Sequence, residues 1–445
     1  MRNDWREVRI CEIGTVVTGR TPPGTKDEYF GGEIPFLTPT DMDGRRRVGI
    51  TQRTLSHEGQ KVLSKVIVPH GVSVSCIGWQ MGKAVLIDKP VATNQQVNTI
   101  IPDRSIIDDM FLYYSLTARS SEIFNLGAGG SRTPILNKSG FESFRIQIPA
   151  LSFQKRIADI LGTLDDKIEL NRQTNETLEA MARRLFRSWF VDFDPVHAKA
   201  AARREFPGLD NAELSRRALP NMAPEIAELF PETFQDSPLG PIPKGWKSGT
   251  LAECASLNPD TWNRKNYPPV IHYVDLSSTK WGVIQKVETF SSANAPSRAQ
   301  RKLRIGDTII GTVRPGNGSF ALVDQENLTG STGFAVLRPN AVEHSEFIYL
   351  SATVNENIDR LAHLADGGAY PAIRPEVVCE TEVVIADPKL MVAFHQKVCD
   401  LFSQMSTNTC LSTELAKSRD ELLPRLLSDE VWTKDLMEEL CHPGT

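Results

Sequence analysis

The chain carries an internal duplication, because two stretches roughly 240 residues apart present the same features in the same order. An apolar strand pattern ending in aspartate occurs at 34–41 and again at 269–275. A strand, a glycine-containing turn and a second strand follow at 66–75 and at 302–311. Further matched pairs are 82–87 with 318–323, 94–102 with 331–339, and the aromatic starts of helical stretches, 111–115 with 347–351. The duplication therefore predicts two domains of one topology.

Short strands and helical stretches mix within each repeat, so the predicted fold class is α+β, with two mixed α/β heads. We place the first repeat at 1–150 and the second repeat at 244–388. In both, the helical stretch leads into a Gly-rich loop, at 127–134 and at 366–371. Between them, 198–243 is first helical and charged and then rich in Pro, Glu and Asp, which indicates a connection.

A long helical pattern closes each repeat, over 151–197 and over 389–428, ahead of a C-terminal tail at 429–445. The first helix repeats Ile157, Leu164, Asn171, Leu178 and Leu185 every seven residues, with Ile160, Lys167, Thr174 and Met181 as a companion row. The second has the rows Val398, Met405, Ser412, Arg419, Leu426 and Phe394, Leu401, Asn408, Leu415, Leu422. Such stripes favour helices that pair, with a polar middle that penalises shifted registers. The alternative is that each helix covers its own domain's sheet.

Catalytic and cofactor motifs are missing from the sequence. It contains no G-x-x-x-x-G-K-[ST], G-x-S-x-G, H-E-x-x-H or G-x-G-x-x-G, and no N-P-P-F or D-P-P-Y of the amino-methyltransferase kind. Seven cysteines form no C-x-x-C pair, which argues against a disulfide framework or a zinc site. The acidic and histidine cluster at 192–197 precedes a proline and is more typical of a helix end than of a metal site. We therefore expect no reaction on this chain.

Two similar heads on a stiff spacer describe a protein that reads two sites, and duplex DNA offers grooves that repeat every ~34 Å. The net charge of −5, from 50 Lys+Arg and 55 Asp+Glu, excludes a strongly basic nucleic-acid binder. Local basic clusters can still neutralise phosphates, and a partner can supply more. The sequence has no apolar run of the ~18–20 residues that a membrane helix needs and no apolar signal region, so we expect a cytoplasmic protein.

Candidate DNA contacts are arginines, lysines and amides in turns, because Arg can donate two bonds to guanine and Asn or Gln can pair with adenine. In the first repeat they are Arg45, Arg46, Arg47, Arg53, Gln80, Lys83, Asn94, Gln95, Gln96 and Arg132. In the second repeat they are Lys280, Arg298, Arg301, Arg314, Asn317, Tyr370 and Arg374. The aromatic cluster at 189–193 is predicted either to be buried at the helix end or to contact a partner subunit.

Over nearly its whole length the chain resembles the specificity subunits of type I restriction-modification systems. Residues 154–195 look like the first central conserved region of that family, and 394–428 are similar to its C-terminal counterpart. The strings at 129–133 and 331–334 look like recurrent elements of target recognition domains. The second Gly-rich loop, 367–370, lacks the hydroxyl residues of the first and departs from the pattern.

The resemblance implies two target recognition domains, separated by an antiparallel two-helix coiled coil, that each read one half of a bipartite DNA sequence. It also implies that the coiled coil binds two modification subunits, which carry S-adenosylmethionine and methylate adenine at N6. Restriction subunits would join them and use ATP and Mg²⁺ for translocation and cleavage. On this interpretation the chain itself is a non-catalytic subunit without a cofactor.

Two other interpretations remain open at this stage. One is a modification enzyme with a fused recognition domain, which stoichiometric binding of S-adenosylmethionine to the isolated chain would indicate. The other is a coiled-coil scaffold that does not read DNA, which an absence of sequence preference at any salt concentration would support.

Overall fold

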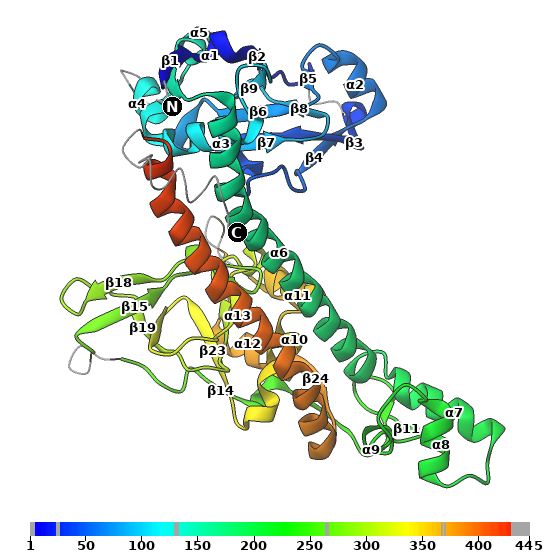
Figure 1. Cartoon of the computed structure of the whole chain (residues 1–445). Helices are drawn as coiled ribbons and strands as arrows, with labels where there is room; N and C mark the ends of the chain where they lie inside the picture. The colour runs from blue at the N-terminus through cyan, green and yellow to red at the C-terminus, as the bar shows by residue number, and fades with distance from the viewer. Residues whose placement is uncertain are drawn as a thin grey trace, which may run out of the picture. The chain divides into compact units, whose positions relative to one another are not determined.

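The computed structural model describes residues 5–23, 27–128, 133–262, 267–365, 368 and 371–428. The chain divides into two compact units (Figure 1). Unit 1 consists of Met1–Arg172 and Thr409–Thr445, and unit 2 of Gln173–Asn408. Each unit therefore contains one repeat together with part of both long helices. Within the described residues, no helix combines the length and the apolar character needed to cross a membrane.

Two four-stranded sheets form the body of the first repeat. The first sheet has the strand order β2 (Gly14–Thr18), β9 (Val97–Pro102), β6 (Gly71–Ser75) and β7 (Ala84–Ile87). The second has the order β4 (Arg53–Leu55), β3 (Phe30–Leu37), β8 (Val91–Thr93) and β5 (Ile67–Val68). Helix α3 (Asp109–Ala118) lies against β6 and β7, and its side chains at Phe111 and Leu112 are fully buried there. Strand β1 (Arg6–Arg9) pairs with β10 (Arg145–Ile148) and so brings both ends of the repeat together.

The second repeat has the same strand orders. Its first sheet has the order β14 (Ala255–Leu257), β23 (Phe334–Pro339), β20 (Thr308–Gly311) and β21 (Phe320–Leu322). Its second sheet has the order β18 (Glu288–Ser291), β15 (Val270–Val274), β22 (Leu328–Ser331) and β19 (Ala299–Lys302). Strand β13 (Lys247–Thr250) pairs with β24 (Glu382–Ile385), as β1 pairs with β10. The matched segments of the sequence thus fold into matched strands.

Strand directions agree as well. The pair β3–β8 is parallel in the first repeat, and its counterpart β15–β22 is parallel in the second. The other pairs within both sheets of each repeat are antiparallel. One parallel pair at the same place in two mixed sheets requires the same crossover of the chain in both, which confirms the predicted duplication.

The two long helices, α6 (Leu151–Phe190) and α13 (Pro388–Leu426), pair inside unit 1. Ile157 and Leu161 of α6 share a core with Leu423 and Leu426 of α13. As the residue number on α6 rises from Asp165 to Asn171, the number of the partner falls from Arg419 to Ser412. The helices are therefore antiparallel in this unit.

The same helices pair inside unit 2. Leu185 and Phe186 pack with Val398 and Leu401. The side-chain amide of Asn408 donates to Oδ1 of Asn175 at 2.8 Å, and that of Asn175 donates to the carbonyl of Met405 at 3.0 Å. Asn408 is buried, as is Asn171 in unit 1, so amides occupy the buried seam. The expectation of paired helices with a polar middle is confirmed.

One of the predicted helix rows was wrong at two of its four positions, although Ile160 packs against the core of unit 1 as expected. The companion row at Ile160, Lys167, Thr174 and Met181 leaves Lys167 exposed and Met181 54% exposed. The structure buries the row one residue later, where Leu161 and Ala182 are fully buried and Trp189 is 3% exposed. Positions three and four residues apart both lie near the same helix face, so the sequence pattern allowed either choice.

The connection folds as a group of short helices within unit 2. Helix α6 ends at Phe190, and α7 (Asp194–Glu205) begins after Phe193, which adopts a left-handed conformation, with Pro195 in its first turn. Helices α8 (Asn211–Ala218) and α9 (Pro224–Ala227) follow. Lys199 is completely buried, and its Nζ donates to Asn211 and to two backbone carbonyls, which satisfies all three of its donors.

Candidate nucleic-acid interface

A 3-10 turn, η3 (Gly78–Gln80), joins β6 to the edge strand β7 in the first repeat. Gly78 has φ +73°, a conformation that glycine adopts without steric cost. Its N–H donates to the carbonyl of Pro134 at 2.9 Å, so the turn lies beside the end of the Gly-rich loop. Gln80 belongs to this turn, and its Oε1 is buried without a hydrogen-bond partner among the described residues. Arg132 lies outside the described residues.

The second repeat has the equivalent turn, η6 (Pro315–Asn317), between β20 and the edge strand β21. The N–H of Arg314 donates to the carbonyl of Pro371 at 2.8 Å, which again ties the turn to the end of the Gly-rich loop. Arg314 itself has φ 48°, in the left-handed region. The predicted contacts Arg314 and Asn317 are thus brought together, while Tyr370 lies outside the described residues.

A further segment runs along the edge strand of the same sheet in the first repeat. Arg47 forms a parallel bridge with Leu86 of β7, and the N–H of Leu86 donates to the carbonyl of Arg46 at 2.7 Å. Nζ of Lys83 donates to the carbonyl of Met42 at 3.1 Å and so joins the turn region to this segment. The predicted basic residues 45–47 therefore lie along β7.

In the second repeat a small hairpin of β16 (Thr279–Lys280) and β17 (Val283–Ile284) takes that place. Gly282 forms a parallel bridge with Ala321 of β21, and the N–H of Trp281 donates to the carbonyl of Gly318 at 2.7 Å. Nζ of Lys280 donates to the carbonyl of Asn317 at 3.2 Å. The predicted contacts Lys280, Arg314 and Asn317 therefore belong to one surface.

Three predicted arginines of the first repeat are at the surface. Arg45 pairs with Asp43 and Arg47 with Asp88, each at 2.8 Å, and all four side chains are 41–50% exposed. The guanidinium of Arg53 lies 4.4 Å above the ring of Phe30. Exposed ion pairs of this kind contribute roughly 0–1 kcal/mol, so a phosphate can compete for either guanidinium at little cost.

Arg46 differs from its neighbours, and the structure favours a structural role for it rather than DNA contact. Its side chain is only 8% exposed and pairs with Asp166 of α6. Nη1 also donates to the carbonyl of Gly162 at 3.2 Å. Burial alone would lower the pKa of Arg46, but hydrogen bonds to Tyr114 and Asp166 raise it overall. A guanidinium held in this way faces the protein.

The predicted amide readers form a short hydrogen-bonded group after β8. Nδ2 of Asn94 donates to Oε1 of Gln96 at 3.3 Å, and the N–H of Gln96 donates to Oδ1 of Asn94. Oε1 of the exposed Gln95 accepts from the hydroxyl of Thr21 at 2.6 Å. The acceptor of Gln95 is thus held in place while its NH₂ group can still donate to a ligand.

The remaining predicted cations of the second repeat differ in environment. Arg298 and Arg374 are exposed. Arg301 is partly buried, burial lowers its pKa, and its Nε has no hydrogen-bond partner among the described residues. A guanidinium in that state gains more from an incoming anion than one already paired with a carboxylate.

Two exposed tryptophans on these surfaces were missed by the sequence interpretation. Trp79, in η3, is 83% exposed, and Trp281, beside η6, is 55% exposed. Each is adjacent to a glycine with positive φ, Gly78 or Gly282. A Gly–Trp or Trp–Gly pair in a turn between two strands is the signal that could have identified them.

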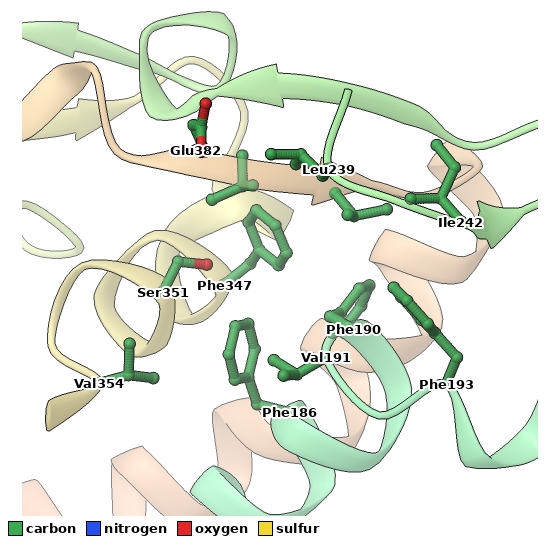
Figure 2. A pocket seen from close by; sticks show the side chains of 12 residues that line it. Phe186, Phe190, Val191, Phe193, Leu239, Ile242, Phe347, Ser351, Val354 and Glu382 are labelled. Atoms are coloured by element: carbon green, nitrogen blue, oxygen red, sulfur yellow. The ribbon is translucent and has the colours of Figure 1, made fainter. Parts of the chain in front are cut away.

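An apolar pocket in unit 2 lies where α6 ends (Figure 2). Its walls include Phe186, Phe190 and Phe193, with Phe347 facing them from α10 (Ser345–Ala352) and Leu239 from the connection. Of the predicted aromatic cluster, Trp189 and Phe190 are buried in the unit's own core. In the described part of the chain, no group of three or more His, Cys, Asp or Glu side chains could hold a metal ion.

The chain is similar to several known proteins of one kind. Residues 2–180 match the family model of the type I restriction modification DNA specificity domain. The chain is 25% identical over 441 residues to the type I restriction enzyme MjaIX specificity subunit of Methanocaldococcus jannaschii, covering 97% of this chain and 95% of that one. It is 27% identical over 391 residues to the HindI specificity subunit of Haemophilus influenzae, covering 79% and 84%.

The fold is also similar to a solved structure, that of the type I restriction-modification system S subunit from M. genitalium. The TM-score is 0.51 at 16% identity, over 95% of this chain and 96% of that one. The sequence relatives match over most of their own length, and the structural match extends through both repeats and both long helices. Residues 2–180 therefore match the DNA specificity domain of type I restriction-modification systems, and the chain as a whole is similar to specificity subunits of those systems.

Proposed function

We propose that this chain is the DNA-recognition subunit of a type I restriction-modification complex, in which each repeat reads one half of a bipartite target. The observation that carries the proposal is the duplication of the candidate surface. In both repeats a 3-10 turn, the edge strand beside it and a flanking segment present cations, amides and an exposed tryptophan. A second copy of such a surface is what a two-part target requires.

The proposed readout divides the residues by role. Exposed Arg45 and Arg47 are placed to contact phosphates, because their present carboxylate partners are weak competitors. Gln80, Gln95 and Asn317 carry amides that suit base edges, where each good bidentate contact discriminates by ~1–3 kcal/mol. Phosphate contacts then set the position of each repeat, and base contacts select the sequence.

The chemistry is proposed to belong to partner subunits. Two modification subunits that bind S-adenosylmethionine would attach through α6 and α13 and methylate adenine at N6. Restriction subunits would use ATP and Mg²⁺. Methylation requires the adenine to be flipped from the duplex, at a cost of a few kcal/mol, and bound recognition domains direct that step to one base. A role on DNA also implies the cytoplasm as the place of action.

Mapping of N6-methyladenine in the host genome tests the proposal. The host and a strain lacking this protein are compared by single-molecule sequencing. We expect one motif of two short blocks, separated by several unspecified base pairs, to be methylated only when the protein is present. Identical methylation in both strains would contradict the proposal, unless the modification subunits are not expressed, which their detection by immunoblot checks.

Purified components separate the competing interpretations. The isolated chain is mixed with S-adenosylmethionine in a calorimetric titration, and we expect no binding, whereas stoichiometric binding would indicate a fused methyltransferase. The assembled complex is then compared on the mapped duplex and on a scrambled duplex of equal length. Equal affinities at every salt concentration would indicate a scaffold that does not read DNA.

A further inference from the structure

Each repeat exposes one tryptophan at the same place in the fold. Trp79 is part of η3, the turn between β6 and β7, and is 83% exposed. Trp281 lies beside η6, the equivalent turn between β20 and β21, and is 55% exposed. An exposed indole lacks the stabilisation that burial in a core would provide. Its occurrence at matched sites in both repeats therefore points to a ligand.

The two tryptophans come from different parts of their repeats. Trp79 is inside the turn, whereas Trp281 belongs to the β16–β17 hairpin, which runs along β21 and reaches the turn from outside. Trp281 therefore has no sequence counterpart in Trp79. Two segments that are not equivalent in the duplication both place a tryptophan beside the equivalent turn. The position of the indole is therefore the shared feature, and not one residue copied in the duplication.

Both rings are held in place before any ligand arrives. Trp79 lies beside Phe124 with ring centroids 6.1 Å apart and planes inclined by 29°, so one neighbouring ring orients it while most of its surface stays exposed. The ring of Trp281 lies over Gly318, where a Cβ atom would come within 2.5 Å of it. Only glycine fits beneath that ring.

Trp281 also has a strained backbone. Its φ is 45°, a region that bulky residues rarely adopt, and its N–H donates to the carbonyl of Gly318 at 2.7 Å. Arg314, at the start of the same turn, has φ 48°. Two non-glycine residues in left-handed conformations on one surface are typical of functional positions, where the rest of the fold maintains the strain.

The surroundings of both rings suit a nucleobase. Gln80 follows Trp79 directly, and its buried Oε1 has no partner among the described residues. Beside Trp281, Nζ of Lys280 and the backbone of Asn317 are joined by a hydrogen bond. An exposed ring next to amide and cationic groups offers stacking, hydrogen bonding and charge to one ligand.

We propose that Trp79 and Trp281 are specificity-determining contacts that place an indole against a nucleobase, one in each half of the DNA target. This inference rests on the proposed function and goes further by naming the residue that meets the base. A stacking or wedge side chain of this kind increases the binding affinity only where the neighbouring base step can be unstacked or kinked. Each tryptophan would thus select sequence within its own half-site.

The test uses the full specificity subunit assembled with its modification subunits. The variants are Trp79→Ala, Trp79→Phe, Trp281→Ala and Trp281→Phe, and the probe is a duplex carrying the motif mapped by N6-methyladenine sequencing. We expect each alanine variant to bind the mapped duplex about 10-fold more weakly, and each phenylalanine variant to recover most of the affinity. Matched controls are Val62→Ala and Val342→Ala, which also truncate exposed apolar side chains.

Duplexes with one scrambled half-site distinguish a base contact from general damage. Trp79→Ala should lose affinity on one type of half-scrambled duplex and bind the other as the unsubstituted complex does. Trp281→Ala should show the opposite pattern. Equal losses on both, or no loss on the mapped duplex, would overturn the inference. If the unsubstituted complex itself does not prefer the mapped duplex, the proposed function fails instead.

Discussion

Arg419 of α13 donates a hydrogen bond of 2.7 Å to Oδ1 of Asp165 on α6, and this buried carboxylate joins the two helices of unit 1 to the first repeat. Its other oxygen accepts a 2.6 Å hydrogen bond from the hydroxyl of Tyr114 on α3. In unit 2 the hydroxyl of Tyr349 on α10 donates to Glu179 of α6 at 3.2 Å. In each unit a tyrosine of the repeat is thus fixed to a carboxylate of α6.

The Asp165 cluster predicts that Asp165→Asn destabilises unit 1 by about 2–3 kcal/mol. The substitution removes the charge that Arg419 faces, and breaking a fully buried pair costs roughly 3–5 kcal/mol. The 26% exposure of the Arg419 side chain reduces that cost. Burial alone would lower the pKa of Arg419, but hydrogen bonds to Asp165 and Asp420 raise it overall, so it stays charged. Urea unfolding followed by circular dichroism measures the change.

A matched control is Lys417→Ala on the same helix. The Lys417 side chain is 79% exposed and its pair with Glu421 spans 4.0 Å, so we expect a change below about 0.5 kcal/mol. Equal stabilities of Asp165→Asn and Lys417→Ala would mean that the buried carboxylate does not hold the cluster together.

The amide pair in the coil of unit 2 predicts a non-additive pair of substitutions. Asn408→Ala should lower stability by about 1–2 kcal/mol, because it removes the hydrogen bond to Oδ1 of Asn175. The double substitution Asn175→Leu with Asn408→Leu should recover or exceed the original stability, since both polar groups leave together. Unfolding of the unsubstituted chain, Asn175→Leu, Asn408→Leu and the double variant in urea gives the coupling energy, and additive losses would contradict the pairing.

The helix rows show how far the sequence could specify packing. All ten positions of the two α13 rows are buried or partly buried, and leucine, valine or phenylalanine occupies six of them, which marks the rows clearly. On α6 the sequence offers Ile160 and Met181 as well as Leu161 and Ala182. A small alanine carries little weight in a hydrophobicity pattern, yet Ala182 is fully buried under neighbouring aromatic rings. The missed row is also the row of Asn175, which therefore went unnoticed.

The candidate surface could be located only in part. The matched strand order identified the turns of Gln80 and of Arg314, because the order of elements fixes which loops correspond. Side-chain direction could not be predicted: Arg45, Arg46 and Arg47 form one basic run, but Arg46 turns toward a carboxylate 120 residues later in the chain. Such a choice depends on tertiary contacts that no local pattern encodes.

Salt dependence of DNA binding should separate these arginines. We expect Arg45→Ala and Arg47→Ala each to reduce the slope of log K against log salt concentration by about 0.9, as loss of one phosphate contact requires. Arg46→Ala should leave the slope unchanged and lower stability instead. Titration of the assembled complex with the mapped duplex at several KCl concentrations measures the slopes, and a reduced slope for Arg46→Ala would restore it as a DNA contact.

Thiol reactivity follows from burial. Burial raises the pKa of Cys76, Cys254 and Cys379 to about 11 in each case, while Cys11 and Cys410 are exposed. A thiol of pKa 11 is only about 0.1% thiolate at pH 8, and the thiolate is the form that reacts. Brief treatment with iodoacetamide at pH 8 should therefore modify Cys11 and Cys410 and spare the other three, as peptide mass spectrometry would show. Prior unfolding in urea should make all five react.

The paired helices predict a change in target spacing when both are lengthened. One heptad is inserted between Leu164 and Asn171 of α6 and one between Ser412 and Arg419 of α13, which keeps the paired rows in phase. Seven residues add about 10 Å of helix, or about three base pairs of duplex. We expect the methylated motif in complemented cells to keep its two blocks and to gain about three base pairs between them. An insertion in α6 alone is the control and should abolish methylation, because the amide layers no longer meet. Altered blocks, or an unchanged gap with both insertions present, would show that the helices do not set the spacing.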